Sequence, residues 1–433
     1  MRRRFADSPP LSSGLAGLAT IIILFVTWPR GIVATPLAEF HLFIALIFVV
    51  MAAVDLLLHK SARQAGLALQ AALTRPWRLD ATLGNKLLAT SVAAGAVWLL
   101  YQHAAIYQDD WYTRFTGPVR DYFALIFAGL LAYVVLVDRL MIEREDDLAR
   151  AGAWLRGLGR NSGREGQGGG IGGFRNVMLA TLIKAFFLPL MYCFALDDWM
   201  FFYTNAISLG SFTEVYEFLY RMAFFVDVLF AVIGYGIASR LLNSHVRWPE
   251  QTLGGWLVCI ICYTPFWQIV GRSYFDFGSE VVWGNVFMRD SPLYIAWGSV
   301  ILGLMAVYML STVAFGNRFS NLTYRGTLWR GPYALTRHPA YISKNLTMWM
   351  INLPFIATSF DEAMGNVIAL LGVNALYFAR ARYEERCCRQ AADYRLYERI
   401  VRRYGIIGRL RRLLRRFRPR HPGRSDVPLR RAR

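Results

Sequence analysis

The chain has 433 residues, of which 55% are hydrophobic, 15% aromatic and only 18% charged. This composition is too apolar for an ordinary soluble fold. The formal charge of +19 is compatible with nucleic-acid binding, but nineteen Arg and only five acidic residues lie from Arg380 to the C-terminus. A basic segment next to a membrane helix is attracted to anionic headgroups. We therefore expect membrane phospholipid, and no nucleic acid, as the partner of this charge.

Ten apolar runs are long enough to cross a hydrocarbon core of about 30 Å. The sequence thus predicts an all-α, polytopic transmembrane helical bundle. The expected spans lie near residues 12–28, 38–58, 86–107, 121–138, 177–196, 221–242, 252–271, 293–314, 341–357 and 363–380.

Lys and Arg gather in alternate connections between these spans, whereas the other connections are poor in cations or acidic. Basic connections face the cytoplasm by the positive-inside rule. We expect an inner-membrane protein with both termini cytoplasmic. The basic groups are Arg2–Arg4, Lys60 to Arg78, Arg240 with Arg247, and Arg318 to Arg337.

A glycine-rich segment, residues 161–175, separates four predicted spans in residues 1–160 from four in residues 176–315. Its composition is typical of a flexible linker. Residues 316–405 form a third region, and residues 406–433 a basic cytoplasmic tail. Arg411 to Phe417 in this tail resemble a short interfacial helix.

Two ionisable residues, Lys184 and Asp227, fall inside predicted spans. Charges are costly in hydrocarbon unless they are paired. We expect these two to form a structural pair rather than part of a transport pathway.

The segment around His338 carries the clearest chemical pattern. Pro339 suits the first turn of a helix, because its missing N–H would be unpaired there anyway, so His338 is expected at the cap. The free amides that follow are a ready anion site, to which Arg337 adds donors.

The last two predicted spans are joined by a short connection and should form an antiparallel hairpin. This hairpin would return Glu384 and Glu385 close to residues 337–341. The two acids are either part of a site or salt-bridged to neighbouring Arg.

Four elements occur in order over about 95 residues: GPY at 331–333, RHPxY at 337–341, an apolar hairpin, and an EE pair at 384–385 followed by YxxY at 394–397. This order resembles the isoprenylcysteine carboxyl methyltransferase family, and is most similar to a bacterial branch of it. The sequence departs from the family at Cys387 and Cys388, and around Ile407 and Gly408.

The resemblance implies a methyltransferase core that uses S-adenosylmethionine, without a metal, in a cytosol-facing pocket. Tyr333, His338, Pro339 and Tyr341 would line the cofactor site, and Glu384 or Glu385 would bind a cofactor hydroxyl or amine. Arg337 or Arg382 would orient an anionic acceptor. Lys344 and Asn345 enter the ninth span early and are expected at the substrate or cofactor mouth, although Lys344 equally suits snorkelling to headgroups.

The expected acceptor is a carboxylate or similar nucleophile on an isoprenoid or lipid-like molecule, which reaches the site from the bilayer. Phospholipid amines and small thiols are alternatives within the same chemistry. A sterol-type membrane reductase using NADPH, and a transporter or scaffold without catalysis, are the other classes compatible with the sequence.

Overall fold

The computed structural model describes residues 11–75, 78–157, 170–275 and 282–416, and these are predominantly helical. Among them, seven helices are long and apolar enough to cross a membrane, as expected for a multi-pass membrane protein. They are α2 (Pro36–Ala53, continued by a π-helical turn Val54–Leu58), α5 (Ala81–His103), α7 (Phe123–Leu140), α9 (Gly170–Thr204), α10 (Phe212–Gly236), α14 (Pro292–Val313) and α16 (Phe360–Cys388).

Shorter elements connect these helices. The shorter α-helices are α1 (Leu11–Thr27), α3 (Ser61–Gln64), α4 (Leu69–Thr74), α6 (Asp110–Asp121), α8 (Asp147–Gly157), α11 (Leu253–Ile260), α12 (Arg272–Tyr274), α13 (Trp283–Val286), α15 (Pro339–Asn352), α17 (Ala392–Tyr404) and α18 (Ile406–Arg416). Strands β1 (Trp248–Pro249) and β2 (Thr323–Tyr324) pair antiparallel, with Trp248 opposite Tyr324.

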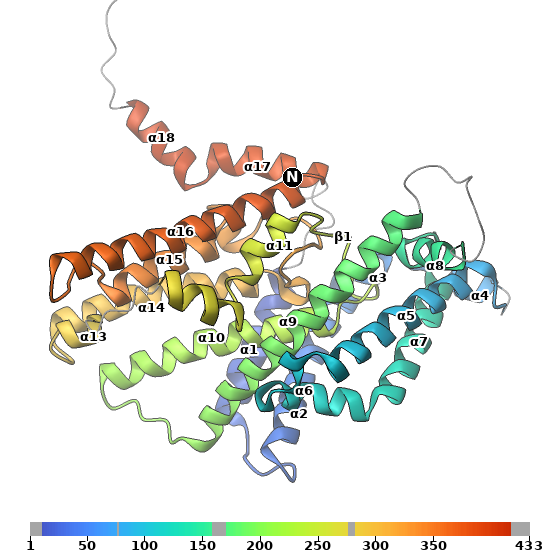
Figure 1. The fold of residues 1–433 in the computed structure, drawn as a ribbon, viewed down its shortest axis with the longest axis horizontal. Coiled ribbons are helices and arrows are strands. Elements are labelled where there is room, and N and C mark those ends of the chain that lie inside the picture. The colour runs from blue at the N-terminus through green and yellow to red at the C-terminus, as the bar shows by residue number, and fades with distance from the viewer. Residues whose placement is uncertain (1–10, 76–77, 158–169, 276–281, 417–433) are drawn as a thin grey trace, which may run out of the picture.

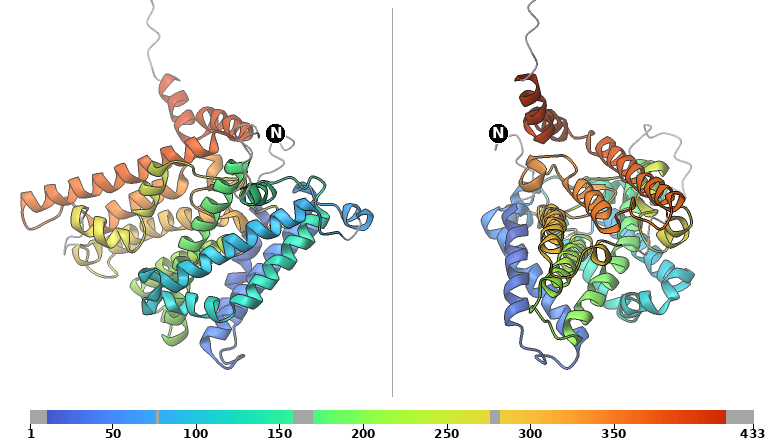
Figure 2. Two further views of the ribbon diagram at one scale, coloured as in Figure 1. Left: turned by 45° about the vertical axis from the view of Figure 1, so that its right-hand side comes forward. Right: turned by 90° about the vertical axis from the view of Figure 1, so that its left-hand side faces the viewer.

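Helix α9 lies in the middle of the molecule, with α5 and α7 on one side and α14, α15 and α16 on the other (Figures 1 and 2). The main core forms where α9 packs on α10, around fully buried aromatic side chains such as Phe187 and Phe225. Helix α10 begins at a capping box formed by Ser211 and Glu214. It is then apolar on almost every side, as expected for a helix enclosed by others.

The bundle has two ends, which we name by the helices found there. The α17 end carries the C-terminal ends of α10, α14 and α16 and the N-terminal end of α15. The opposite end carries the start of α10 at Phe212 and of α16 at Phe360. Helix α18 continues from α17 and exposes an apolar row that includes Ile406 and Leu410.

One polar side chain joins three parts of the chain at the start of α9. The Asn176 amide donates to Asp147 of α8 at 3.0 Å, and its oxygen accepts from Gln251 at 2.9 Å. Gln251 follows β1, which pairs with the loop before α15. The first half of the chain is therefore tied directly to the segment that leads into the predicted site.

Two predicted spans differ from the structure. The seventh, 252–271, is interrupted: α11 ends at Ile260, and helical structure resumes only in a π-helical turn at Trp267. Pro265 lies in the gap, and proline lacks the N–H that a continuous helix requires. The apolar run at 252–271 had predicted one continuous span.

The ninth predicted span, 341–357, is a helix of only 14 residues, α15. Its length of about 21 Å is less than the hydrocarbon thickness. It ends at Leu353, whose φ of 40° is left-handed. Trp297 Nε1 donates to the Met350 carbonyl at 3.0 Å and so satisfies one of the acceptors left open at this helix end. A count of ten full spans is not confirmed.

The predicted boundaries of the linker and the tail also need adjustment. Helix α9 begins at Gly170, so residues 170–175 are helical rather than linker. Residues 161–169 lie outside the described part of the chain, as do Arg2–Arg4 and residues 417–433. The expected interfacial helix corresponds to α18, which starts earlier, at Ile406.

Candidate functional site

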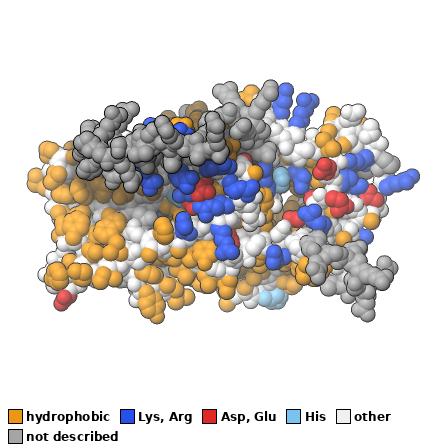
Figure 3. Space-filling view, turned by 90° about the horizontal axis from the view of Figure 1, so that it is seen from above, with side chains coloured by type: hydrophobic (Ala, Val, Ile, Leu, Met, Phe, Trp, Pro, Cys, Tyr) orange, Lys and Arg blue, Asp and Glu red, His pale blue; other side chains and the backbone are white. Residues whose placement is uncertain are grey.

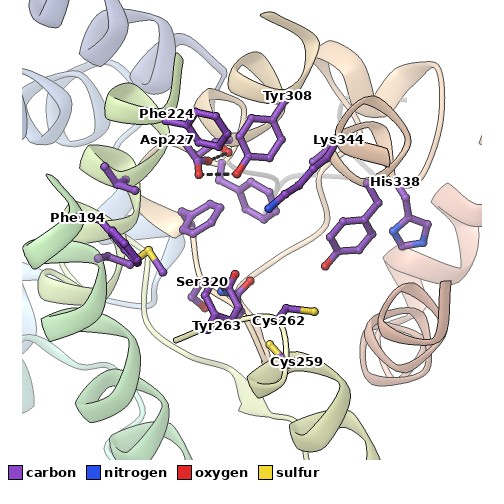
Figure 4. Close-up of a pocket in the computed structure, with 18 of the residues that line it drawn as sticks. Phe194, Phe224, Asp227, Cys259, Cys262, Tyr263, Tyr308, Ser320, His338 and Lys344 are labelled. Carbon is purple, nitrogen blue, oxygen red and sulfur yellow. Dashed lines mark hydrogen bonds between the residues drawn. The ribbon is translucent and has the colours of Figure 1, made fainter. Parts of the chain in front are cut away.

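A cavity of about 1190 Å³ lies among α10, α11, α14, α15, α16 and the loop before α15. It exceeds the usual range of ligand pockets, about 300–1,000 Å³. Its lining runs from His338 and Tyr397 at the α17 end to Ser208 and Glu214 at the opposite end. Figure 4 shows side chains converging on it from several helices, with Lys344 between His338 and the Asp227–Tyr308 pair.

Helices α15 and α16 form the predicted hairpin and bring the two halves of the sequence pattern together. His338 Nε2 lies 2.9 Å from Glu385 Oε1, and the Tyr341 hydroxyl donates to Glu384 Oε1. His338 is the residue before Pro339 and stands at the cap of α15, as expected. The rings of His338 and Tyr341 are stacked, with centroids 5.7 Å apart.

Behind this contact lies a charge cluster formed by Arg337, His338, Glu385, Arg389 and Glu398. Glu385 is 3% exposed and pairs with Arg337 at 2.9 Å and with Arg389 at 2.8 Å. Glu398 binds both arginines from α17, and hydrogen bonds from Arg389 lower the pKa of Glu398. Figure 3 shows basic and acidic side chains grouped on this face of the molecule. The cluster locks α17 against the start of α15.

Arg380 extends into the cavity one turn before the acids on α16. It is 5% exposed and donates to Asn321 Oδ1 at 2.6 Å and to Tyr263 at 3.3 Å. Its Nε lies 3.4 Å from Glu384 Oε1, and its guanidinium lies 5.3 Å from the ring centroid of Tyr341. A cation, a carboxylate and aromatic faces therefore share one compartment, which suits a ligand carrying charges of both signs.

The tyrosines of the GPY and YxxY elements close the α17 end of the cavity. Tyr333, Tyr394 and Tyr397 all line it. The Tyr397 hydroxyl donates to the Tyr333 carbonyl at 2.8 Å. Burial raises the pKa of Tyr397 above its ordinary value, so this hydroxyl stays protonated and remains a donor at neutral pH.

Farther into the bundle, Lys344 and Asp227 line the same cavity. Asp227 accepts from the Tyr308 hydroxyl at 2.7 Å and from Thr312. The Lys344 ammonium lies 5.5 Å from the Tyr377 ring centroid and 5.8 Å from that of Tyr308. Lys344 thus points into the cavity rather than toward headgroups.

The expected pair of Lys184 with Asp227 is not formed. The partners of Asp227 are the two hydroxyls on α14, and its nearest cations are Lys344 and Arg380. Lys184 lies near Arg325 instead. Hydroxyl donors on the adjacent helix satisfy the carboxylate, so the expected pairing with Lys184 was wrong.

The predicted site residues fall into two groups. Those that line the cavity are Tyr333, Arg337, His338, Tyr341, Lys344 and Glu384. Glu385 and Pro339 are buried beside it in the charge cluster and in the first turn of α15. Asn345 donates to the Tyr341 carbonyl within α15 and is not part of the lining.

Arg382 is also not part of the lining. Its side chain is 60% exposed and approaches Glu385 only at 3.9 Å. Arg380, two positions earlier, takes the inward place. The i, i+4 spacing of Arg380 and Glu384 was a signal for this, because residues four apart share a helix face.

Sequence reasoning missed the contributions of Asn321, Tyr263 and Tyr308. These residues lie on the loop before α15, next to the break after α11 and on α14. No local motif marks them, because only the packing of distant elements brings them together.

Comparison with known proteins adds no assignment. No family model, no curated protein and no solved structure matches this chain. The chemistry of the cavity must therefore be argued from its own side chains.

Proposed function

We propose that this protein is an S-adenosylmethionine-dependent methyltransferase of the inner membrane, acting on a lipophilic acceptor, with the α17 end and both termini in the cytoplasm. The observation that carries the proposal is the meeting of His338 and Tyr341 with Glu384 and Glu385 at the mouth of one cavity. These are the residues through which the sequence resembles the isoprenylcysteine carboxyl methyltransferases.

The side chains present fit the donor. S-Adenosylmethionine supplies an electrophilic methyl group on a sulfonium when bound. Glu384 offers a carboxylate to the amine or a ribose hydroxyl. The first amides of α15, which have no partner within the helix, offer donors to the carboxylate.

The geometry changes the role of His338. Because its Nε2 faces Glu385, the imidazole acts as a positioning residue that holds the start of α15 against α16. Arg337, expected to orient an anionic acceptor, also pairs with Glu385 and Glu398. We propose that Glu384, Tyr341 and the first amides of α15 contact S-adenosylmethionine directly.

The acceptor would enter from the bilayer and place its nucleophile near the polar groups in the middle of the cavity, Lys344, Asp227 and Tyr308. The nucleophile forms a bond to the methyl carbon while the bond to sulfur breaks, leaving a neutral thioether. Such an in-line transfer requires close positioning more than proton transfer. The apolar walls exclude water, which strengthens the polar contacts there.

Ligand titration of the purified full-length protein tests this proposal. We expect S-adenosylmethionine to bind, NADPH not to bind, and Glu384→Gln to weaken donor affinity at least tenfold. Glu362→Gln is the matched control, since Glu362 is an acid at the other end of the same helix and is not part of the cavity lining. Binding of NADPH alone would replace the donor assignment with the reductase alternative. A labelled methyl group added with lipid extracts would then identify whether oxygen, nitrogen or sulfur is methylated.

A further inference from the structure

Arg325 is a buried arginine of the cavity lining that has no anionic partner among the described residues. Arg325 is 4% exposed, and its Nη1 donates to the Gly234 carbonyl at 2.6 Å. Its Nε and Nη2 have no hydrogen-bond partner among the described residues. Buried donors are nearly always paired, so an open guanidinium edge indicates a missing acceptor.

The surroundings of Arg325 add positive charge rather than compensating it. The Lys184 ammonium of α9 is close enough to Arg325 for the two charges to repel each other. In the part of the chain that the structure describes, neither residue forms an ion pair with a carboxylate. Burial lowers the pKa of Arg325 to about 10, which leaves the guanidinium charged at neutral pH.

His245 completes this group, and its Nδ1 also lacks a partner among the described residues. Burial, and then the charge of four neighbouring arginines, lowers the pKa of His245 to about 3, so the imidazole is neutral at pH 7. The four arginines are Arg240, Arg247, Arg318 and Arg325. Of the described acids that influence or pair with these arginines, Asp146 pairs with Lys86 and Arg240, and Asp55, which acts on Arg318, accepts from Asn317.

Arg325 is part of the lining of the cavity, together with Arg318 and Asn321. The Nε and Nη2 groups of a guanidinium form a planar fork that matches two oxygens of a phosphate or carboxylate. Arg325 and Lys184 have no carboxylate partner among the described residues. Two such cations favour a phosphate, which can carry two negative charges, over a carboxylate, which carries one. The rest of the cavity is lined largely by aromatic and aliphatic side chains, which suit acyl or isoprenoid chains.

We propose that Arg325, supported by the charge of Lys184 and by the neutral His245 imidazole, forms a phosphate-binding site for a membrane lipid whose chains occupy the cavity. This binding does not depend on the reaction proposed for Glu384. Inorganic phosphate carries the same chemical group as the lipid headgroup and is the alternative ligand.

The test uses the full-length protein in a non-ionic detergent and three matched probes: dioctanoyl phosphatidic acid, dioctanoylglycerol and inorganic phosphate. We expect the phosphatidic acid to bind at least tenfold more tightly than either of the others. Arg325→Gln should raise its dissociation constant at least tenfold, and Lys184→Met at least threefold. Arg330→Gln is the control, because Arg330 is an exposed arginine in the same loop and should leave binding unchanged.

Three outcomes would overturn the proposal. Equal binding of phosphatidic acid to wild type and Arg325→Gln would remove Arg325 from recognition. Equal affinity for the diacylglycerol would show that only the chains are bound. Inorganic phosphate binding as tightly as the lipid would overturn the lipid assignment.

The unfolding temperature of each variant shows whether a loss of lipid binding comes from misfolding. A purely structural arginine should lower the unfolding temperature when replaced, whereas removal of an uncompensated buried charge should leave it unchanged or raise it. We expect the second result for Arg325→Gln without ligand. Arg325→Lys keeps the charge but loses the planar fork, and should show intermediate affinity for the phosphatidic acid. Neither readout involves methyl transfer, so failure of the proposed function would leave this test intact.

Discussion

The His338 imidazole and the Glu385 carboxylate lie 2.9 Å apart although 47 positions separate them in the chain. The contact exists only because α15 and α16 form an antiparallel hairpin. Glu385 also accepts from Arg337 and Arg389, so one nearly inaccessible carboxylate joins both helices and the approach to α17. The hairpin and the candidate site are therefore stabilised by the same group.

Glu385→Gln should destabilise the protein by about 2 kcal/mol, because the partly exposed Arg337 and Arg389 lose their buried partner but keep Glu398. Unfolding in denaturant, followed by tryptophan fluorescence in detergent, measures the loss. Glu362→Gln on the same helix should cost clearly less, since that carboxylate accepts from Thr358 and has no cationic partner among the described residues. Equal losses for the two variants would contradict a central role for Glu385.

Arg380 and Arg382 provide a matched pair two positions apart. Arg380→Lys should weaken donor binding at least tenfold, because an ammonium cannot bridge Asn321, Tyr263 and Glu384 as the planar guanidinium does. Arg382→Lys should change it less than twofold, since Arg382 points outward. Titration calorimetry of both variants with S-adenosylmethionine measures the two affinities. The reverse order of effects would restore the role that the sequence first assigned to Arg382.

Asp227→Asn should separate acceptor binding from donor binding. Asp227 and Tyr308 lie in the middle of the cavity, away from Glu384, so donor affinity should stay within twofold of wild type. Transfer of labelled methyl groups to lipid extract should fall at least tenfold, because the carboxylate that fixes Tyr308 and Thr312 is lost. Asp361→Asn, at the exposed start of α16, is the control. Unchanged transfer in Asp227→Asn would exclude this region from acceptor binding.

The pair of Asp80 with Arg144 predicts a small acid sensitivity. A hydrogen bond from Arg144 lowers the pKa of Asp80 to about 2 from its ordinary value of 3.8. The resulting stabilisation is complete above about pH 4 and declines as the pH falls toward 2. Because Asp80 is partly exposed, the effect should stay below about 1 kcal/mol.

Asp80→Asn isolates this charge effect. Asparagine also caps helices well, so the bond to the Leu83 amide should persist. We expect the variant to unfold at a lower temperature than wild type at pH 6, with the difference shrinking at pH 3. A difference independent of pH would show that the charge has no part in it.

Much of the bundle could be predicted because long apolar runs leave little choice of structure in a membrane. The helices around Phe43, Phe187 and Phe225 lie where their runs were expected. The hairpin prediction also placed His338 near Glu385. The end of α15 beside Leu353 involves a distant neighbour, Trp297, which hydropathy does not reveal. The break at Pro265 was missed because hydropathy alone does not register the missing N–H of proline.

The site could be predicted only where neighbouring residues carry a motif. His338, Tyr341 and Glu384 follow a local order and were found. Arg380 was passed over for Arg382 because helix phase was not used to orient the two side chains. Asp227 was assigned to the wrong partner, since hydroxyl donors on another helix leave no trace in the spacing of charges.

The bridge made by Asn176 gives the first half of the chain a mechanical role. Helix α9, at 35 residues, is about 52 Å long and extends well beyond the hydrocarbon core. Its projecting end reaches both α8 and the segment after β1. The N-terminal helices consequently support the segment at the cavity mouth. A shortened chain beginning at α10 would lose the contacts that fix the position of this segment.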